Sequence, residues 1–233
     1  LRGPNVLEVP HEKKEIAGGA VEVGFDINGK EFHFRAGQYV WITLPHLFYD
    51  DERGASRCFS IASSPNDKKF LRIAFRASES EFKRSLARMD LGGEIEIEGP
   101  FGDMVLPEDC SAPIVFVAGG IGITPFMSML RFATEEKTPC NITLLYANRN
   151  PESAVYLEEL EEMARRNDRL VLCSHAGRID AAAIQKNVSE DKIKTAHWYI
   201  VGPPAMAAET ENILKELGVG RGRMRFTEFI GYS

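Results

Sequence analysis

Two short stretches contain residues whose types and spacing could bind an anionic ligand. In segment 118–125, "AGGIGITP", Gly119, Gly120 and Gly122 follow an apolar run and precede Pro125. Glycines between a strand and a helix let the backbone turn tightly and let a ligand approach bare amide groups. A helix N-terminus adds N–H donors and a partial positive charge, which favour a phosphate. A tight turn without a ligand is the alternative, because the glycines do not spell the G-x-G-x-x-G pattern.

The second stretch is "RCFS", residues 57–60. Arg57 carries a fixed positive charge that can fork onto a phosphate. Phe59 lies two positions later on the same strand face and could lie flat against a planar ring, and Ser60 adds a hydroxyl. An ordinary strand with an exposed arginine and a core phenylalanine is the alternative.

A further group of candidate anion ligands surrounds the start of a helix predicted over 80–89. The group comprises Arg76, Ser78, Ser80 and Lys83. Ser78 or Ser80 is expected as the N-cap, and hydroxyls with basic side chains at a helix N-terminus can hold an anion. A capped helix with solvated charges would explain the same residues.

The segments that must position these residues change in character near residue 108. Short alternating runs precede it, at 20–27, 30–36, 38–44, 57–63, 70–77 and 94–100. The dipeptide Asn28-Gly29 predicts a hairpin between the first two runs. These runs predict an antiparallel six-stranded β-barrel, interrupted by the helix over 80–89.

After residue 108, strands alternate with helices. The predicted strands are 113–118, 141–147, 169–174, 197–202 and the terminal run from 223. The first predicted helix follows the first of these strands and ends at about 134, and the other helices are 154–166, 180–187 and 205–217. This alternation predicts an α/β doubly wound parallel sheet, which binds ligands at the carboxyl ends of its strands. We therefore expect two domains, 1–108 and 109–233.

Composition narrows the classes of function. The net charge of the 233 residues is -6 and both signs are interspersed, which argues against a nucleic-acid partner. The chain has no apolar run long enough to span a membrane and no secretory signal, so we expect a cytoplasmic protein, either free or on the cytoplasmic side of a membrane complex. The chain starts with Leu, which leaves a longer protein open. The four cysteines form no C-x-x-C pair, so free thiols and no metal site are expected.

Seven segments, in this order, resemble the ferredoxin-NADP reductase superfamily over nearly the whole chain from about residue 15. They are "HFRAGQYVWITL", "RCFSIASSP", "SEFKRSLARMDLGGEIEIEGPFGDMVL", "VFVAGGIGITPFMSMLR", "LLYANRN", "YIVGPPAM" and "TEF". The resemblance implies an FAD-binding barrel followed by an NAD(P)-binding domain. It also implies an NAD(P)H-dependent flavoprotein oxidoreductase that passes hydride to FAD and electrons to a separate or fused acceptor, such as ferredoxin, a haem domain or a membrane domain.

In the barrel, the resemblance implies that Arg57 binds the flavin pyrophosphate and that Phe59 stacks on one face of the isoalloxazine ring. Ser60 would lie near the flavin N5, and Phe229 would cover the other face. The remaining implied flavin neighbours are Cys58, Ile73, Ala74, Phe75, Arg76, Ser80, Phe82 and Lys83.

In the second domain, the resemblance places Gly120, Gly122 and Ile123 under the phosphates of NAD(P)H. The other implied neighbours of this coenzyme are Thr124, Pro125, Asn148, Arg149, Ser174, Arg178, Gly202, Pro203, Pro204 and Met206. The side chains expected at the reacting atoms are Ser60, Thr124 and Glu228. Arg149, Ser174 and Arg178 favour NADPH over NADH.

Three departures from the family pattern leave alternatives open. Val201 replaces the usual cysteine before Gly-Pro-Pro, "TEF" leaves the role of Glu228 open, and a glycine is missing before Ser80, which keeps FMN open beside FAD. Two other functions remain: a non-catalytic flavin electron-transfer subunit, and a nucleotide-binding regulatory module without flavin.

Overall fold

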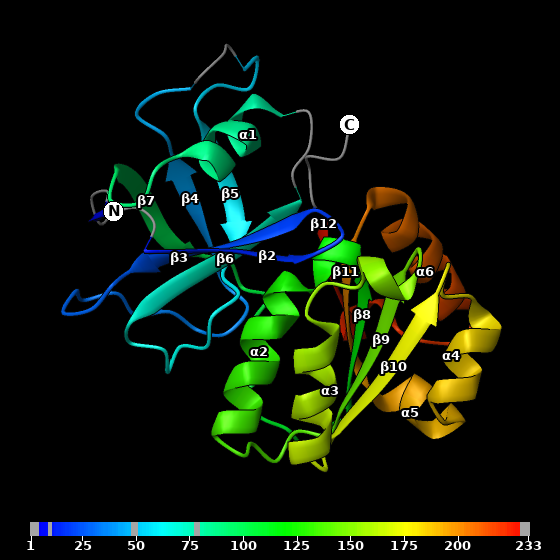
Figure 1. Cartoon of the computed structure of the whole chain (residues 1–233). Helices are drawn as coiled ribbons and strands as arrows, with labels where there is room; N and C mark the ends of the chain where they lie inside the picture. The colour runs from blue at the N-terminus through cyan, green and yellow to red at the C-terminus, as the bar shows by residue number, and fades with distance from the viewer. Residues whose placement is uncertain (1–4, 9–10, 48–50, 77–79, 229–233) are drawn as a thin grey trace.

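A computed structural model describes residues 5–8, 11–47, 51–76 and 80–228 of the chain. Figure 1 shows two parts: antiparallel strands from the N-terminal half in one, and a parallel sheet flanked by helices in the other. The two-domain architecture expected from the sequence is therefore confirmed.

The first domain contains a four-stranded sheet in the order β1-β7-β4-β5 and a three-stranded sheet in the order β2-β3-β6, with antiparallel neighbours in both. The bounds are β1 (Asn5–Glu8), β2 (Glu12–Ala17), β3 (Ala20–Asp26), β4 (Tyr39–Thr43), β5 (Ser56–Ser60), β6 (Phe70–Arg76) and β7 (Glu94–Phe101). A bridge between Ile61 and Ile73 joins the sheets around one core. Helix α1 (Glu81–Arg88) buries Phe82 and Leu86 in that core.

A single closed six-stranded barrel is not confirmed, and the strand predicted over 30–36 is wrong. No strand is present there. Strand β3 already pairs with β2 on one edge and β6 on the other, so no edge remains for a hairpin partner after Asn28-Gly29. Phe32 and Phe34 still pack against the core, which accounts for the alternation. The hairpin forms instead at Gly18-Gly19, both with positive φ, between strands β2 and β3.

The second domain is the predicted parallel sheet, with five strands in the order β10-β9-β8-β11-β12. Its strands are β8 (Ile114–Gly119), β9 (Ile142–Asn148), β10 (Leu170–Ala176), β11 (His197–Gly202) and β12 (Met224–Glu228). Its helices are α2 (Thr124–Glu135), α3 (Leu157–Arg166), α4 (Ala181–Asn187), α5 (Glu190–Thr195) and α6 (Pro204–Glu216), with 3-10 turns η1 (Gly120–Ile123), η2 (Pro151–Ser153) and η3 (Arg221–Arg223). The strand order reverses between β8 and β11, which is where such sheets bind ligands.

Helices cover both faces of this sheet (Figure 1). Helices α2 and α3 pack on one face, around Phe116 and Tyr146, and α4, α5 and α6 pack on the other, around Trp198. The first cluster continues into the other domain through Ala20 and Ala74. The two domains therefore share an apolar contact beside β6.

The cysteines differ in part from expectation. Cys58 and Cys173 are free, whereas Cys110 and Cys140 form a disulfide with their Cα atoms 4.6 Å apart. The expectation of four free thiols is wrong because the fold brings the segment after β7 against the start of β9, which sequence spacing does not reveal. None of the helices in the described part of the chain is long and apolar enough to cross a membrane.

Candidate cofactor-binding site at the domain junction

The side chain of Arg57, on β5, is held in one place by four acceptors. Its Nη1 donates to the backbone carbonyls of Arg53, Gly54 and Ser56 at 2.9, 3.0 and 2.7 Å. Its Nη2 donates to the carboxylate of Asp51. The guanidinium also lies 5.4 Å from the ring centroid of Phe82. The charge of Arg57 is thus fixed beside the start of α1.

Asp51 closes this cluster with both carboxylate oxygens. Oδ1 accepts the backbone N–H of Arg53 at 3.0 Å, and Oδ2 accepts the backbone N–H of Phe82 at 3.1 Å and the hydroxyl of Ser80 at 3.4 Å. Burial pushes the pKa of Asp51 upward, but the N–H groups of Phe82 and Arg53 and the charge of Arg57 outweigh it, so the pKa lies below its ordinary value. Asp51 is therefore an anion bound at the N-terminus of α1.

Lys83 adds a further positive charge to this anion-binding cradle, which we define as Asp51, Arg53, Arg57, Ser80, Phe82 and Lys83. Burial, followed by repulsion from Arg57 and Arg53, holds the pKa of Lys83 below its ordinary value. Three positively charged side chains, Arg53, Arg57 and Lys83, thus belong to the cradle. A phosphate group, with its larger charge and more acceptor oxygens, fits this set of donors.

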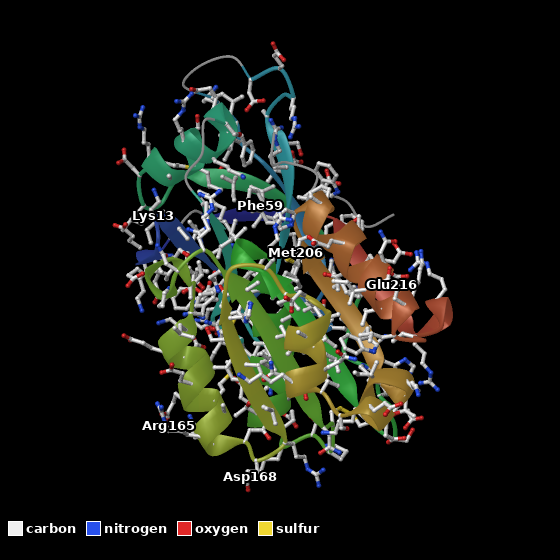
Figure 2. All side chains as sticks on the ribbon, turned by 90° about the vertical axis from the view of Figure 1, so that its right-hand side faces the viewer. Lys13, Phe59, Arg165, Asp168, Met206 and Glu216 are labelled. Atoms are coloured by element: carbon white, nitrogen blue, oxygen red, sulfur yellow. A yellow bond between two sulfur atoms is a disulfide. The ribbon has the colours of Figure 1, made fainter. Side chains whose placement is uncertain are left out.

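Phe59 lies deeper than its predicted role suggests. Its ring is 6% exposed and packs against Phe75 and Phe82, with centroids 5.8 and 5.9 Å away. Ser60 is buried beside it, whereas Cys58 is exposed on the opposite face of β5. Figure 2 shows Phe59 at the level where the two domains meet. Stacking of a ring on Phe59 stays a prediction.

Strand β6 carries the next predicted residues. Ile73 and Phe75 point into the core of the first domain, and Ala74 packs into the cluster shared with the second. Arg76 lies apart from the cradle, because its guanidinium donates to the carbonyls of Gly18 at 2.5 Å and Ser153 at 2.6 Å. In this structure Arg76 connects the domains.

The carboxyl ends of β8 and β11 lie where the strand order reverses, the position at which a doubly wound sheet binds ligands in a crevice. A Cβ at Gly122 would lie 2.5 Å from the carbonyl oxygen of Val201, and one at Gly119 would lie 2.5 Å from Sδ of Met206. A Cβ at Gly202 would also collide with Met206. Figure 2 places Met206 where the domains meet. Three glycines therefore allow β8, η1 and β11 to approach closely under the thioether of Met206.

The residues that follow these glycines begin α2, as predicted from Pro125. Gly120 has a φ of 55°, which glycine adopts without strain. Ile123, Thr124 and Pro125 are buried, and the hydroxyl of Thr124 donates to the carbonyl of Ile121 at 2.7 Å. The Thr124 hydroxyl thus stabilises the turn.

Asn148 ends β9, beside this crevice in the sheet. It is 7% exposed, and neither the oxygen nor the nitrogen of its side-chain amide has a hydrogen-bond partner. Burying such a group without a partner costs about 1–3 kcal/mol, so this amide can pair with a ligand or a water at the carboxyl edge of the sheet. Arg149 follows Asn148 and is exposed, and Ser174 is exposed on β10, which pairs with β9. Nη1 of Arg178 lies 3.5 Å from Oε2 of Glu209.

The last predicted residues fall at the end of the described chain. Glu228 ends β12, where its backbone pairs with Gly202 of β11. Pro203 caps α6 and Pro204 begins it. Phe229 lies outside the described residues.

Sequence reasoning missed an ion-pair network between the domains. Arg131, on α2, binds Glu159 with Nε and Nη2 at 2.7 and 2.8 Å, and lies 3.6 Å from Glu22 on β3. The hydroxyl of Tyr156 donates to Glu22 at 2.5 Å. Burial, with the nearby charge of Glu22, raises the pKa of Tyr156, so this hydroxyl keeps its proton. The sequence did not reveal this network, because its charged residues are far apart along the chain.

Known proteins match the sequence and the fold of this chain. Residues 116–212 match the family described as the oxidoreductase NAD-binding domain. The chain is 33% identical over 151 residues to ferredoxin–NADP reductase B of Sorangium cellulosum. The matched segment covers 64% of this chain and 60% of that protein. It is 26% identical over 207 residues to flavohemoprotein A of Dictyostelium discoideum, covering 83% of this chain and 52% of that one.

Among solved structures, the fold matches the flavohemoglobin of Malassezia yamatoensis, a structure with bound FAD and haem. The TM-score is 0.79 at 20% identity, over 97% of this chain and 60% of that one. The chain thus spans 52% and 60% of the two curated relatives, and the match includes both of its domains. The chain is thus similar in sequence to a ferredoxin–NADP reductase and a flavohemoprotein, and similar in fold to a flavohemoglobin.

Proposed function

We propose that this chain is a flavin-dependent NAD(P)H oxidoreductase unit, which takes hydride from NAD(P)H onto FAD and passes electrons to an acceptor. The observation that carries the proposal is the contact between β6 and η1, where the strand assigned to the flavin meets the glycine turn assigned to the coenzyme. We also propose that the domain boundary falls between residues 108 and 109, within the segment that joins β7 to β8.

The anion-binding cradle fits the pyrophosphate of FAD. Arg57 and the N–H of Phe82 already hold an anionic group, and Lys83 and Arg53 supply additional positive charge. In the proposal, Arg57 binds the pyrophosphate, and Ser80 donates a hydroxyl to it. Ile73, Ala74 and Phe75 border the isoalloxazine, with Phe59 and Ser60 beside it. When bound, the flavin supplies the hydride acceptor and the relay of electrons.

The glycine crevice and the unpartnered amide of Asn148 fit a dinucleotide. Gly120 has open space around its Cα, so a phosphate can approach its backbone. Asn148 offers a donor and an acceptor to the adenosine part, while Gly202, Pro203 and Met206 position the nicotinamide. The contribution of these residues is orientation, since holding two reactants in attack geometry can remove about 7–11 kcal/mol from a barrier. Thr124 acts through the turn that it stabilises.

The proposal extends to the electron acceptor and the cellular location. Because the chain spans about half the length of the curated relatives that it matches, we propose that the acceptor is a separate protein or a fused haem or membrane domain. Exposed Arg149 and Ser174 favour NADPH. A cytoplasmic location stays a prediction, and the Cys110–Cys140 disulfide is the observation against it, because structural disulfides are rare in reducing compartments.

The test is a flavin titration followed by a coenzyme assay. The purified chain should quench FAD fluorescence at one site and then oxidise NADPH or NADH with ferricyanide as the electron acceptor. A chain that binds FAD but oxidises neither coenzyme would be a non-catalytic flavin subunit. A chain that binds either coenzyme but never FAD would be the regulatory module, and the proposal would fail.

A further inference from the structure

We infer that the carboxylate of Asp51 competes with a flavin phosphate for the donors of the anion-binding cradle, so that Asp51 sets the affinity of the chain for phosphorylated flavins. This inference rests on the proposed function, because that function assigns the same donors to the flavin pyrophosphate. It concerns a residue to which neither the family resemblance nor the sequence pattern gives a role.

The geometry of Asp51 carries the first step. Its two carboxylate oxygens accept hydrogen bonds from Arg57, from the backbone N–H of Phe82 and from the hydroxyl of Ser80. These are the guanidinium, the helix N–H and the hydroxyl that a terminal phosphate oxygen would use. An N–H group has one hydrogen and cannot serve the carboxylate and a phosphate fully at once. Binding of the phosphate therefore requires Asp51 to leave.

Burial and charge carry the second step. The side chain of Asp51 is 9% exposed and that of Arg57 is 16% exposed, so their attraction is screened less than that of a surface pair. Lys83 and Arg53 lie in the same cluster, and their charges favour an anion there whichever group supplies it. Asp51 and the phosphate thus bind the same positive site in place of one another.

The consequence for affinity follows from the equilibrium between the two occupants. The apparent dissociation constant of a ligand rises as the fraction of protein with an accessible site falls. Asp51→Asn keeps the size of the side chain and removes its charge, which weakens its hold on Arg57. We expect this variant to bind FAD and FMN roughly tenfold more tightly than the wild type.

The experiment measures the quenching of FAD, FMN and riboflavin fluorescence by the apoprotein, for the wild type and each variant. Riboflavin has the ring system without a phosphate, so its affinity should not change in Asp51→Asn. Glu52→Gln is the matched control, because it removes one negative charge from the adjacent exposed residue outside the cradle. This control should change each dissociation constant less than about twofold, since exposed charges are screened.

A second measurement covers the possibility that Asp51→Asn folds poorly. A ligand that binds only the folded state stabilises it by RT ln(1 + [L]/Kd), so tighter binding at a fixed ligand concentration raises the melting temperature more. The rise caused by FAD should be larger in Asp51→Asn than in the wild type, even if the variant melts lower alone. If Asp51→Asn aggregates, Asp51→Ser removes the same charge with a smaller side chain and should give the same tighter binding.

Each outcome decides the inference separately from the proposed function. Tighter FAD and FMN binding with unchanged riboflavin binding supports it. Unchanged or weaker FAD binding in Asp51→Asn overturns the inference while leaving the proposed function intact. Equal tightening in Glu52→Gln attributes the effect to overall charge and also overturns it. Failure of the wild type and every variant to bind any flavin overturns both.

Discussion

The two cofactor regions are built from different parts of the polypeptide. In the first domain, side chains from separate segments converge on one anionic group, with Arg57 and Asp51 at the centre. In the second, the absence of side chains at Gly119, Gly122 and Gly202 lets strands and turn approach. A cradle of side chains can be satisfied by a carboxylate of the same chain, whereas the glycine turn depends on close approach of backbone segments.

Of the substitutions considered, those in the cradle should change cofactor affinity most. Arg57→Ala should weaken FAD binding roughly 10- to 100-fold, because a charge-assisted, forked contact is lost. Equilibrium dialysis with FAD measures this directly. Arg57→Lys keeps the positive charge but cannot form the forked contact, so its FAD affinity should lie between those of the wild type and Arg57→Ala. FAD affinity that is equal in all three proteins would remove Arg57 from the pyrophosphate site.

In the second domain the glycines are tested by adding a methyl group, because glycine has no side chain to remove. Gly122→Ala places a Cβ 2.5 Å from the Val201 carbonyl, which should destabilise the fold by about 1–3 kcal/mol and weaken coenzyme binding. Gly220→Ala is the control, because its φ is -68° and no atom lies within 4 Å of the added Cβ. Urea unfolding and NADPH titration should change only in Gly122→Ala. Equal behaviour of the two variants would contradict a close backbone approach.

Arg131 lies at the centre of the ion-pair network, with Glu159 in its own domain and Glu22 in the other. Glu159→Gln removes the charge opposite Arg131, and because Glu159 is partly exposed we expect a loss of about 1 kcal/mol. Glu158→Gln, on the exposed side of the same helix, should change the unfolding free energy little. Chemical denaturation of both variants measures the difference. An unfolding free energy of Glu159→Gln equal to that of the wild type would show that the Arg131 contact contributes nothing.

The pH dependence of stability should distinguish the cradle from the crevice. The folded pKa of Asp51 lies below its unfolded value, so the folded state favours the charged form. The stabilisation from Asp51 is therefore present above the unfolded pKa of about 3.9 and is lost as the pH falls through the folded pKa. The difference in unfolding free energy between wild type and Asp51→Asn should shrink from pH 7 to pH 3. A constant difference would mean that charge is not what Asp51 contributes.

The smallest expected effect concerns the thiols, which lie in neither region. Unfolded without a reductant, the chain should expose the thiols of Cys58 and Cys173 to a thiol reagent, and those of Cys110 and Cys140 only after reduction. Four reactive thiols in protein that has never been reduced would contradict the disulfide.

The sequence predicted the crevice better than the cradle for a physical reason. Glycines after a buried strand have a local meaning, so the turn at Gly119–Gly122 and the start of α2 followed from adjacent residues. The partners of Arg57 depend on the path of residues 51–54, and no local pattern shows where Asp51 points. The strand predicted over 30–36 was wrong for a similar reason. Its alternating residues are visible in the sequence, but the pairing of both edges of β3 is not.

The most direct test of the junction is anaerobic mixing of the FAD-loaded chain with NADPH or NADH, with flavin absorbance recorded over time. The account predicts that the flavin bands bleach with no partner protein present, and that Gly122→Ala slows the bleaching while retaining FAD. Flavin that remains oxidised in the wild type at saturating concentrations of both coenzymes would contradict hydride transfer between the two domains.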